Sequence, residues 1–172
     1  MNAYLLSVLL ESAMQSTPLA KTDNILVLGA GELGMAVLHE LAGRSGVRVS
    51  VMLRPSATGA ASADKRQLLA ELDRLGVSVV TADVVNDSEQ SLATLFSAFD
   101  KLISCLGFVA GPGIQLKLTR AALRSEVKHY VPWQFGVDYD QIGYGSPQDL
   151  FDKQLDVRQL LRSQSRLQWQ II

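Results

Sequence analysis

Residues 25–34 read ILVLGAGELG, an apolar run that ends in glycines and leads into a helix-forming segment. Four consecutive apolar residues are typical of a strand that is buried on both faces, as in a parallel sheet. The residues from Met35 to Ala42 are strong helix formers. The stretch therefore predicts a strand, a glycine turn and a helix, in that order.

The three glycines of this turn have the spacing G-x-G-x-x-G, the fingerprint of a dinucleotide-binding unit. The first glycine would allow the tight turn, the second the close approach of a pyrophosphate, and the third close packing of helix on strand. The free N–H groups and positive end of the helix would face the phosphates. The alternative is a plain structural turn. We predict a nucleotide cofactor held by Gly29, Gly31, Glu32, Leu33 and Gly34.

Length and composition limit the class of protein. With 172 residues, 48% of them hydrophobic, the chain is long enough for one domain with a sizeable core. A net charge of −1 argues against a nucleic-acid or anionic-membrane partner, and no apolar run approaches the ~20 residues needed to cross a bilayer. The single cysteine, Cys105, cannot form an internal disulfide, which favours a reducing compartment. We predict a cytoplasmic protein with no membrane contact.

We interpret residues 1–23 as a leader of unclear role and residues 24–172 as one nucleotide-binding domain. Tyr4 to Leu10 is apolar, like the core of a signal peptide, but no basic residue precedes Lys21. A secretory signal carries a positively charged segment before its apolar core. The sequence therefore argues against secretion.

The rest of the chain alternates between strand and helix patterns. We predict a loop at 56–63 able to fold over a ligand, and a long functional loop at 133–147. This alternation is typical of an α/β fold with a doubly wound (Rossmann) parallel sheet of about six strands. Because the last predicted strand ends the chain, we expect the nucleotide-binding half of something longer. The predicted strands span 25–28, 47–53, 77–81, 101–106, 129–131 and 167–172, and the helices span 32–42, 64–75, 87–98, 114–124 and 148–163.

The residue after the second predicted strand indicates which dinucleotide is bound. An NAD site usually has an acidic residue about 20 positions after the glycines, whereas an NADP site has an arginine for the 2′-phosphate. Here that position is Arg54, with no acidic residue between Val47 and Ala63. We predict NADPH or NADP; the alternative is a solvated arginine. Lys65 and Arg66 either add to the phosphate site or lie on an exposed helix face.

Two further strand ends point to the same crevice, because ligands of this architecture sit at the carboxyl ends of the strands. Asp83 follows the third strand and either bonds the adenine amino group or caps a turn. Gly107 follows the fourth and either lets the backbone approach the nicotinamide ribose or simply ends a strand. We count both as candidate cofactor-binding residues.

Common catalytic patterns are missing from the sequence. No tyrosine is followed four residues later by a lysine, the pair that ordinary short-chain dehydrogenases use. His39 and His129 have no ligand-spaced companions, so we predict no metal site. Cys105, inside an apolar strand, is interpreted as a packing residue.

Several motifs together resemble a known family. The chain from about Asn24 to Ile172 is similar to the isoflavone-reductase-like (NmrA-like) family of atypical short-chain dehydrogenases, and in particular to fungal aromatic alcohol reductases. The segment PWQFG within 131–138 is specific, whereas the glycine triplet is not. The resemblance rests on GAGELG at 29–34, Arg54, VPWQFGVD at 131–138, LFD at 150–152 and VR at 157–158.

The resemblance implies several functional features. Members bind NADPH, and the loop after the fifth strand lies beside the nicotinamide, which makes Trp133, Gln134 and Phe135 candidate cofactor-binding residues. Reductases of the family use a lysine on the next helix as general acid or base. A smaller C-terminal substrate domain follows in these proteins, and this chain is truncated before it.

The lysine is where the chain departs from the family pattern. Counted from the flanking motifs, the family's lysine falls at Gln154, which cannot transfer a proton as lysine does. The neighbouring Lys153 is displaced by about 100° of helix rotation. Lys153 is therefore the candidate catalytic residue. The alternative is a surface lysine paired with Asp149.

Three arginines, Arg158, Arg162 and Arg166, recur at intervals of four and share one helix face. Charged residues with this spacing are typical of a solvated surface. We interpret the three side chains as a solvated stripe.

Two function hypotheses follow. The first is an NADPH-dependent reductase, or its cofactor-binding portion, acting on a small aromatic carbonyl or alcohol-type substrate. The second is a non-catalytic NADP(H)-sensing regulatory protein of the NmrA-like type, which binds a protein partner. The displaced lysine favours the second and the PWQFG loop the first. A final strand that exposes Trp169, Ile171 and Ile172 at the sheet edge would favour an oligomer.

Overall fold

The computed structural model describes residues 22–58, 62–108, 111 and 113–171. The predicted leader lies outside the described residues, except for Thr22 and Asp23. The strands are β1 (Asp23–Leu28), β2 (Val47–Leu53), β3 (Ser78–Thr81), β4 (Lys101–Ser104), β5 (His129–Val131) and β6 (Gln168–Trp169). The helices are α2 (Glu32–Ala42), α3 (Pro55–Thr58), α4 (Ala63–Arg74), α5 (Glu89–Phe96), α6 (Ile114–Arg124), α7 (Tyr139–Ile142) and α8 (Asp149–Arg162).

The six described strands form one parallel sheet in the order β3-β2-β1-β4-β5-β6. Val27 of β1 lies opposite Val51 of β2 on one side and Ile103 of β4 on the other. From β1 the sheet continues through β2 to β3 on one side, and through β4 and β5 to β6 on the other. The predicted doubly wound Rossmann sheet is confirmed, with its switch point between β1 and β4.

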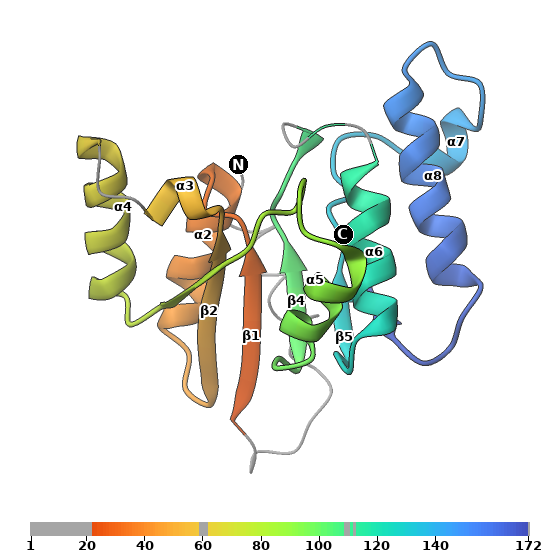
Figure 1. The fold of residues 1–172 in the computed structure, drawn as a ribbon. Coiled ribbons are helices and arrows are strands. Elements are labelled where there is room, and N and C mark those ends of the chain that lie inside the picture. The colour runs from red at the N-terminus through yellow and green to blue at the C-terminus, as the bar shows by residue number, and fades with distance from the viewer. Residues whose placement is uncertain (1–21, 59–61, 109–110, 112, 172) are drawn as a thin grey trace.

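Side chains of β1 alternate between two separate cores, as the period of a strand requires. Leu26 and Leu28 pack with α5, α6 and α8, whereas Ile25 and Val27 pack with α2 and α4. In Figure 1, α5 lies in front of the sheet and α2 behind it. All four side chains are fully buried, which explains why β1 is an uninterrupted apolar run.

Three segments differ from the prediction. The start of the loop predicted at 56–63 is the one-turn helix α3, because proline at its first position has a backbone angle suited to a helix start. The loop at 133–147 contains α7, whose first turn is capped by the Asp138 carboxylate. The last strand has only two residues, and Trp169 is partly buried against the core. The expectation that Trp169 is exposed at the sheet edge is therefore wrong.

Candidate functional site

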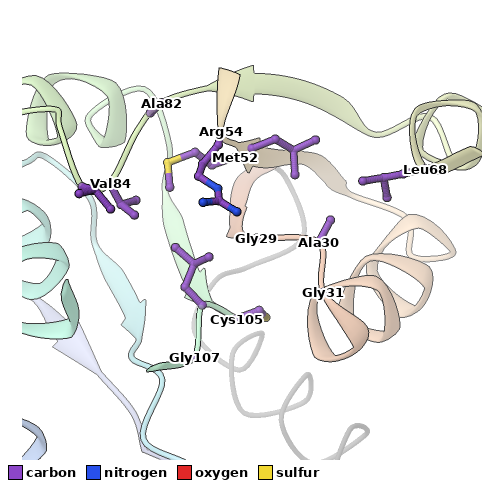
Figure 2. Close-up of a pocket in the computed structure, with 13 residues that line it drawn as sticks. Gly29, Ala30, Gly31, Met52, Arg54, Leu68, Ala82, Val84, Cys105 and Gly107 are labelled. Atoms are coloured by element: carbon purple, nitrogen blue, oxygen red, sulfur yellow. The ribbon is translucent and has the colours of Figure 1, made fainter. Parts of the chain in front are cut away.

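A cavity of about 360 Å³ opens at the carboxyl ends of β1, β2 and β4. Its lining includes the glycine turn after β1, Arg54 after β2 and Gly107 after β4 (Figure 2). Most of the remaining wall is apolar and includes Leu53, Ala82 and Val84. The cavity thus lies at the switch point of the sheet, where ligands bind in this architecture.

The three glycines of the turn have three different surroundings. Gly29 has a φ of +94°, and a Cβ there would come within 2.7 Å of the Leu106 side chain. A Cβ on Gly34 would overlap the Gly29 carbonyl oxygen, so α2 packs against the turn closely enough to require glycine. A Cβ on Gly31 would meet no atom within 4 Å. Two glycines therefore build the turn, and the third leaves its backbone open to a ligand.

The N-terminus of α2 faces this opening. Its cap is Gly31, which has no side chain to accept a bond from the first turn. The first hydrogen bond of the helix runs from the Met35 N–H to the Gly31 carbonyl, at 2.8 Å. Glu32 is exposed, and Leu33 packs against the core beneath. The helix start therefore offers N–H groups and open space together, which fits a phosphate.

Arg54 stands opposite the glycine turn. It is exposed, and Figure 2 shows its guanidinium directed into the cavity from the end of β2. The Lys65 ammonium of α4 donates a hydrogen bond of 2.6 Å to the carbonyl of Ser56, which lies two residues after Arg54. A cation at this strand end suits a ribose phosphate.

Asp83 caps a turn. Its carboxylate accepts hydrogen bonds from the N–H groups of Val85 (2.9 Å) and Asn86 (3.2 Å) and from the Asn86 amide (2.8 Å). These bonds, led by the one from the Asn86 side chain, hold the pKa of Asp83 below its ordinary value. The neighbours Ala82, Val84 and Val85 line the cavity. Of the two roles considered, the structure displays the cap; a contact with adenine stays a prediction.

Aromatic rings lie behind Gly107, at one end of the cavity. A Cβ on Gly107 would lie 3.5 Å from the indole of Trp133. Trp133 also meets Phe108 edge to face, with ring centroids 4.5 Å apart, and Phe135 at 6.1 Å. The structure thus brings Trp133 and Phe135 to the Gly107 end of the cavity.

Gln134 points the other way, toward α8. It is buried, its amide donates to the Gln154 side chain at 2.5 Å, and its carbonyl oxygen accepts from Arg158 at 2.9 Å. Of the three candidates in the PWQF segment, Gln134 is therefore the one that the structure separates from the cavity.

A sequence model of the NmrA-like family matches residues 21–168. The chain belongs to the NmrA-like family. The resemblance predicted from the PWQFG segment and its flanking motifs is thereby confirmed.

Two relatives show the extent of the match. The NmrA-like chain is 45% identical over 154 residues to an NmrA-like family domain-containing oxidoreductase of Gibberella moniliformis (strain M3125 / FGSC 7600), covering 88% of this chain and 50% of that protein. It is 27% identical over 150 residues to pinoresinol reductase 2 of Arabidopsis thaliana, covering 83% and 46%. The chain spans about half the length of these relatives.

Solved structures share the fold. AtPrR2 with NADP+ and (+)pinoresinol is 25% identical, with a TM-score of 0.69 over 84% of this chain and 47% of that one. The binary complex of leucoanthocyanidin reductase with NADPH from Vitis vinifera is 20% identical, with a TM-score of 0.67 over 86% and 48%. The second likeness shows the fold alone.

Gln154 and Lys153, the two residues at the position where the resemblance predicts a lysine, have different surroundings. Gln154 is 1% exposed and faces Gln134, and its amide nitrogen has no hydrogen-bond partner among the described residues. Lys153 is half exposed, and its ammonium lies 3.1 Å from the Asp156 carboxylate. Its partner is thus Asp156, not Asp149 as the surface alternative had it. The structure does not bring Lys153 to the cavity lining.

The interpretation of the three arginines as a solvated stripe is wrong for Arg158. That residue is 7% exposed and bonded to Gln134, Asp138 and Asp140. Arg162 is half exposed and also bonds Asp140, whereas Arg166 donates to backbone carbonyls at the end of α6. Spacing alone shows which arginines share a face, but not that the 133–147 segment folds over that face. Asp138 and Asp140 of that segment were the sequence signal that could have indicated partners for Arg158.

Cys105 and the metal-ligating side chains of the described residues were also considered as reactive groups. Burial raises the pKa of the Cys105 thiol to about 12, which fits a packing residue. Within the described ranges, no group of three or more metal-ligating side chains comes together. The described helices include none with the length and apolar character needed to cross a membrane.

Proposed function

We propose that this chain binds NADPH or NADP in the cavity at the ends of β1, β2 and β4. The observation that carries the proposal is the pairing of Arg54 with the open backbone at Gly31 across one cavity. Gly31 and the N-terminus of α2 would hold the pyrophosphate, and Arg54 the 2′-phosphate. The apolar wall at Ala82 and Val84 suits the adenine ring. The NADP+ complex of AtPrR2 supports this choice of cofactor.

Gly107 and Trp133 would bound the nicotinamide end of the same cofactor. Gly107 lines the cavity without a side chain, so its backbone is accessible there. Trp133 and Phe135 would limit the space behind it and keep water away. NADPH, when bound, supplies the hydride, so the protein's task is to orient it.

The function we propose is that of an NADPH-dependent reductase, or its cofactor-binding portion, acting on a small aromatic carbonyl or alcohol-type substrate. The relatives named as oxidoreductase and pinoresinol reductase support it. Lys153 is the candidate acid or base. Its surface ion pair with Asp156 holds it weakly, since exposed pairs contribute only about 0–1 kcal/mol.

A second candidate function is that of an NADP(H)-sensing regulatory protein without turnover. Gln154 favours it, because a buried carboxamide at the position where the resemblance predicts a lysine cannot act as a general acid or base. In this case the partner would be a protein that recognises the loaded form.

Cofactor choice is tested by titrating the purified chain with NADPH, NADP and NADH while following nicotinamide fluorescence. We expect NADPH to bind more tightly than NADH, and Arg54→Gln to weaken NADPH about tenfold with little change for NADH. Arg48→Gln is the matched control, since Arg48 is an exposed arginine near the opposite end of β2. NADH binding as tight as NADPH binding would refute the role of Arg54, and no binding at all would refute the site.

Turnover separates the two candidate functions. A panel of aromatic aldehydes and enones is offered with NADPH to the wild type, Lys153→Ala and Gln154→Lys. Wild-type turnover that Lys153→Ala abolishes supports the reductase with Lys153 as its acid or base. Binding without turnover, with activity gained in Gln154→Lys, supports the regulator.

Location and assembly are part of the same proposal. A single cysteine, buried at Cys105, fits the cytoplasm, and a fluorescent fusion would test it. We also predict an oligomer that forms through the sheet edge at the short β6, and light scattering would test it.

A further inference from the structure

A buried latch joins the segment after β5 to helix α8. At its centre is the Arg158 guanidinium, which donates from Nε to the Gln134 side chain and from Nη1 to Asp138 (3.1 Å) and Asp140 (2.6 Å). The guanidinium also lies 5.3 Å from the centroid of the Tyr139 ring. These partners all belong to the segment between β5 and α8. The bonds that compensate for burying this cation therefore hold that segment in place.

The geometry of Gln134 is fixed from both sides. A guanidinium can only donate, so the carbonyl oxygen of Gln134 must face Arg158. Its amide nitrogen then faces α8, where it donates to the side chain and the backbone carbonyl of Gln154. A buried carboxamide with both ends bonded has one orientation. The latch thus fixes residue 134 with respect to α8.

The residue before Gln134 lies behind the cavity lining at Gly107. Trp133 precedes Gln134 and turns to the opposite side, against Gly107 and Phe108. The hydroxyl of Tyr139 adds a second tie, because it donates to the Phe135 carbonyl at 2.9 Å. In Figure 1, α7 and α8 lie side by side, away from β1 and β2. A change at Arg158 would therefore reach the cavity through the backbone from 133 to 135.

The geometry points to Arg158 and Gln134 as positioning residues that set Trp133 behind Gly107, at the nicotinamide end of the cavity. Neither residue lines the cavity. Both act through Trp133, whose indole lies beside the lining residue Gly107. The inference about cofactor position rests on the proposed function, whereas the position of Trp133 does not. Arg158 has a matched control in Arg162, which is half exposed and bonds the same Asp140 carboxylate at 2.8 and 2.7 Å.

The test compares Arg158→Gln, Arg158→Lys, Gln134→Leu and Arg162→Gln in a Trp169→Phe background, so that Trp133 is the one remaining tryptophan. Three quantities are measured: the emission maximum of Trp133 without cofactor, the dissociation constant for NADPH, and the melting temperature. Lysine keeps the charge but has no planar fork to serve Gln134 and the carboxylates together. Arg158→Lys therefore stays informative if Arg158→Gln does not fold.

We expect Arg158→Lys and Gln134→Leu to shift the Trp133 emission to longer wavelength and to weaken NADPH binding about tenfold. Arg162→Gln should leave both unchanged. The latch is overturned if Arg158→Lys and Gln134→Leu lower only the melting temperature, with emission and NADPH binding as in the control. A wild type that binds no NADPH refutes the proposed function, and the emission maxima then still decide whether Arg158 and Gln134 position Trp133.

Discussion

The two ends of the cavity are held in different ways. At the β1–β2 end, a glycine turn shapes the site, since Gly29 and Gly34 permit a turn that side chains would obstruct. At the β4–β5 end, side chains do the work, because Arg158 of α8 reaches Gln134 across 24 residues of sequence. The turn at the first end requires glycines without side chains, whereas the second end requires the hydrogen bonds that particular side chains form. Substitutions should therefore act by opposite mechanisms at the two ends.

The difference also separates cofactor binding from chemistry. The β1–β2 end keeps the features that a dinucleotide needs, with an open Gly31 and a cation at Arg54. On α8, the position where the resemblance predicts a lysine is Gln154, which is hydrogen-bonded to Gln134 of the latch. The features for holding a cofactor and the residue expected to move a proton are therefore separate in this chain, and substitutions can test them one at a time.

The largest effect is expected at the β1–β2 end, from Gly34→Ala. The new methyl group would overlap the Gly29 carbonyl, so α2 must move away from the turn. We expect a loss of about 3 kcal/mol in the free energy of unfolding, seen as a melting temperature lower by roughly 10 °C.

Gly31→Ala is the matched control for this substitution. Its methyl group meets no atom within 4 Å, and Gly31 has a φ of −72°, so we expect a stability change within about 0.5 kcal/mol. NADPH binding should nevertheless weaken about tenfold or more, because the methyl group would occupy the space in which we propose that the pyrophosphate binds. Equal melting temperatures for the two variants would break the distinction between turn-building and ligand-facing glycines.

Most of the fold was predictable because its signals are local. The apolar run of β1 and the glycines that follow it require no distant partner to be recognised. Short elements were harder. The two-residue β6 and the one-turn helices α3 and α7 depend on neighbours, and hydrophobic period says little over so few residues.

The cavity lining was predictable, but the contacts behind it were not. Sequence reasoning identified Gly29, Gly31, Arg54 and Gly107, and the structure brings these four to one cavity. The same kind of reasoning assigned Arg158 to a solvated face, although it is buried. Its hydrogen-bond partners Asp138 and Asp140 lie 20 and 18 residues away in sequence. Helix periodicity contains no information about such partners.

A pH dependence is expected at the latch end. Hydrogen bonds from Arg162, and then Arg158, hold the pKa of Asp140 well below its usual range. A lowered folded-state pKa contributes stability that is present above the ordinary aspartate pKa of about 3.9 and is lost as pH falls below it. The difference in unfolding free energy between wild type and Asp140→Asn should be constant from pH 7 to about 5 and shrink below about pH 4.

This dependence is checked by urea unfolding at a series of pH values. Arg162→Gln serves as a second variant, because it removes the leading cause of the shift and leaves the carboxyl in place. Its difference from wild type should shrink over the same range. Differences that stay constant down to pH 3 would show that Asp140 is not held as an ion pair in solution.

The smallest effect is expected for Lys153→Ala on α8. The residue is half exposed, and its pair with Asp156 is of the surface kind, so the free energy of unfolding should change by less than about 0.5 kcal/mol. Arg74→Ala is the matched control, since Arg74 forms a similar exposed i,i+3 pair with Glu71 on α4. Because Lys153 does not line the cavity, NADPH binding should be unchanged in both variants. If Lys153→Ala weakened NADPH binding tenfold and Arg74→Ala did not, the lysine would contact the cofactor from α8. Lys153 would then take the place of the lysine that the resemblance predicts at Gln154.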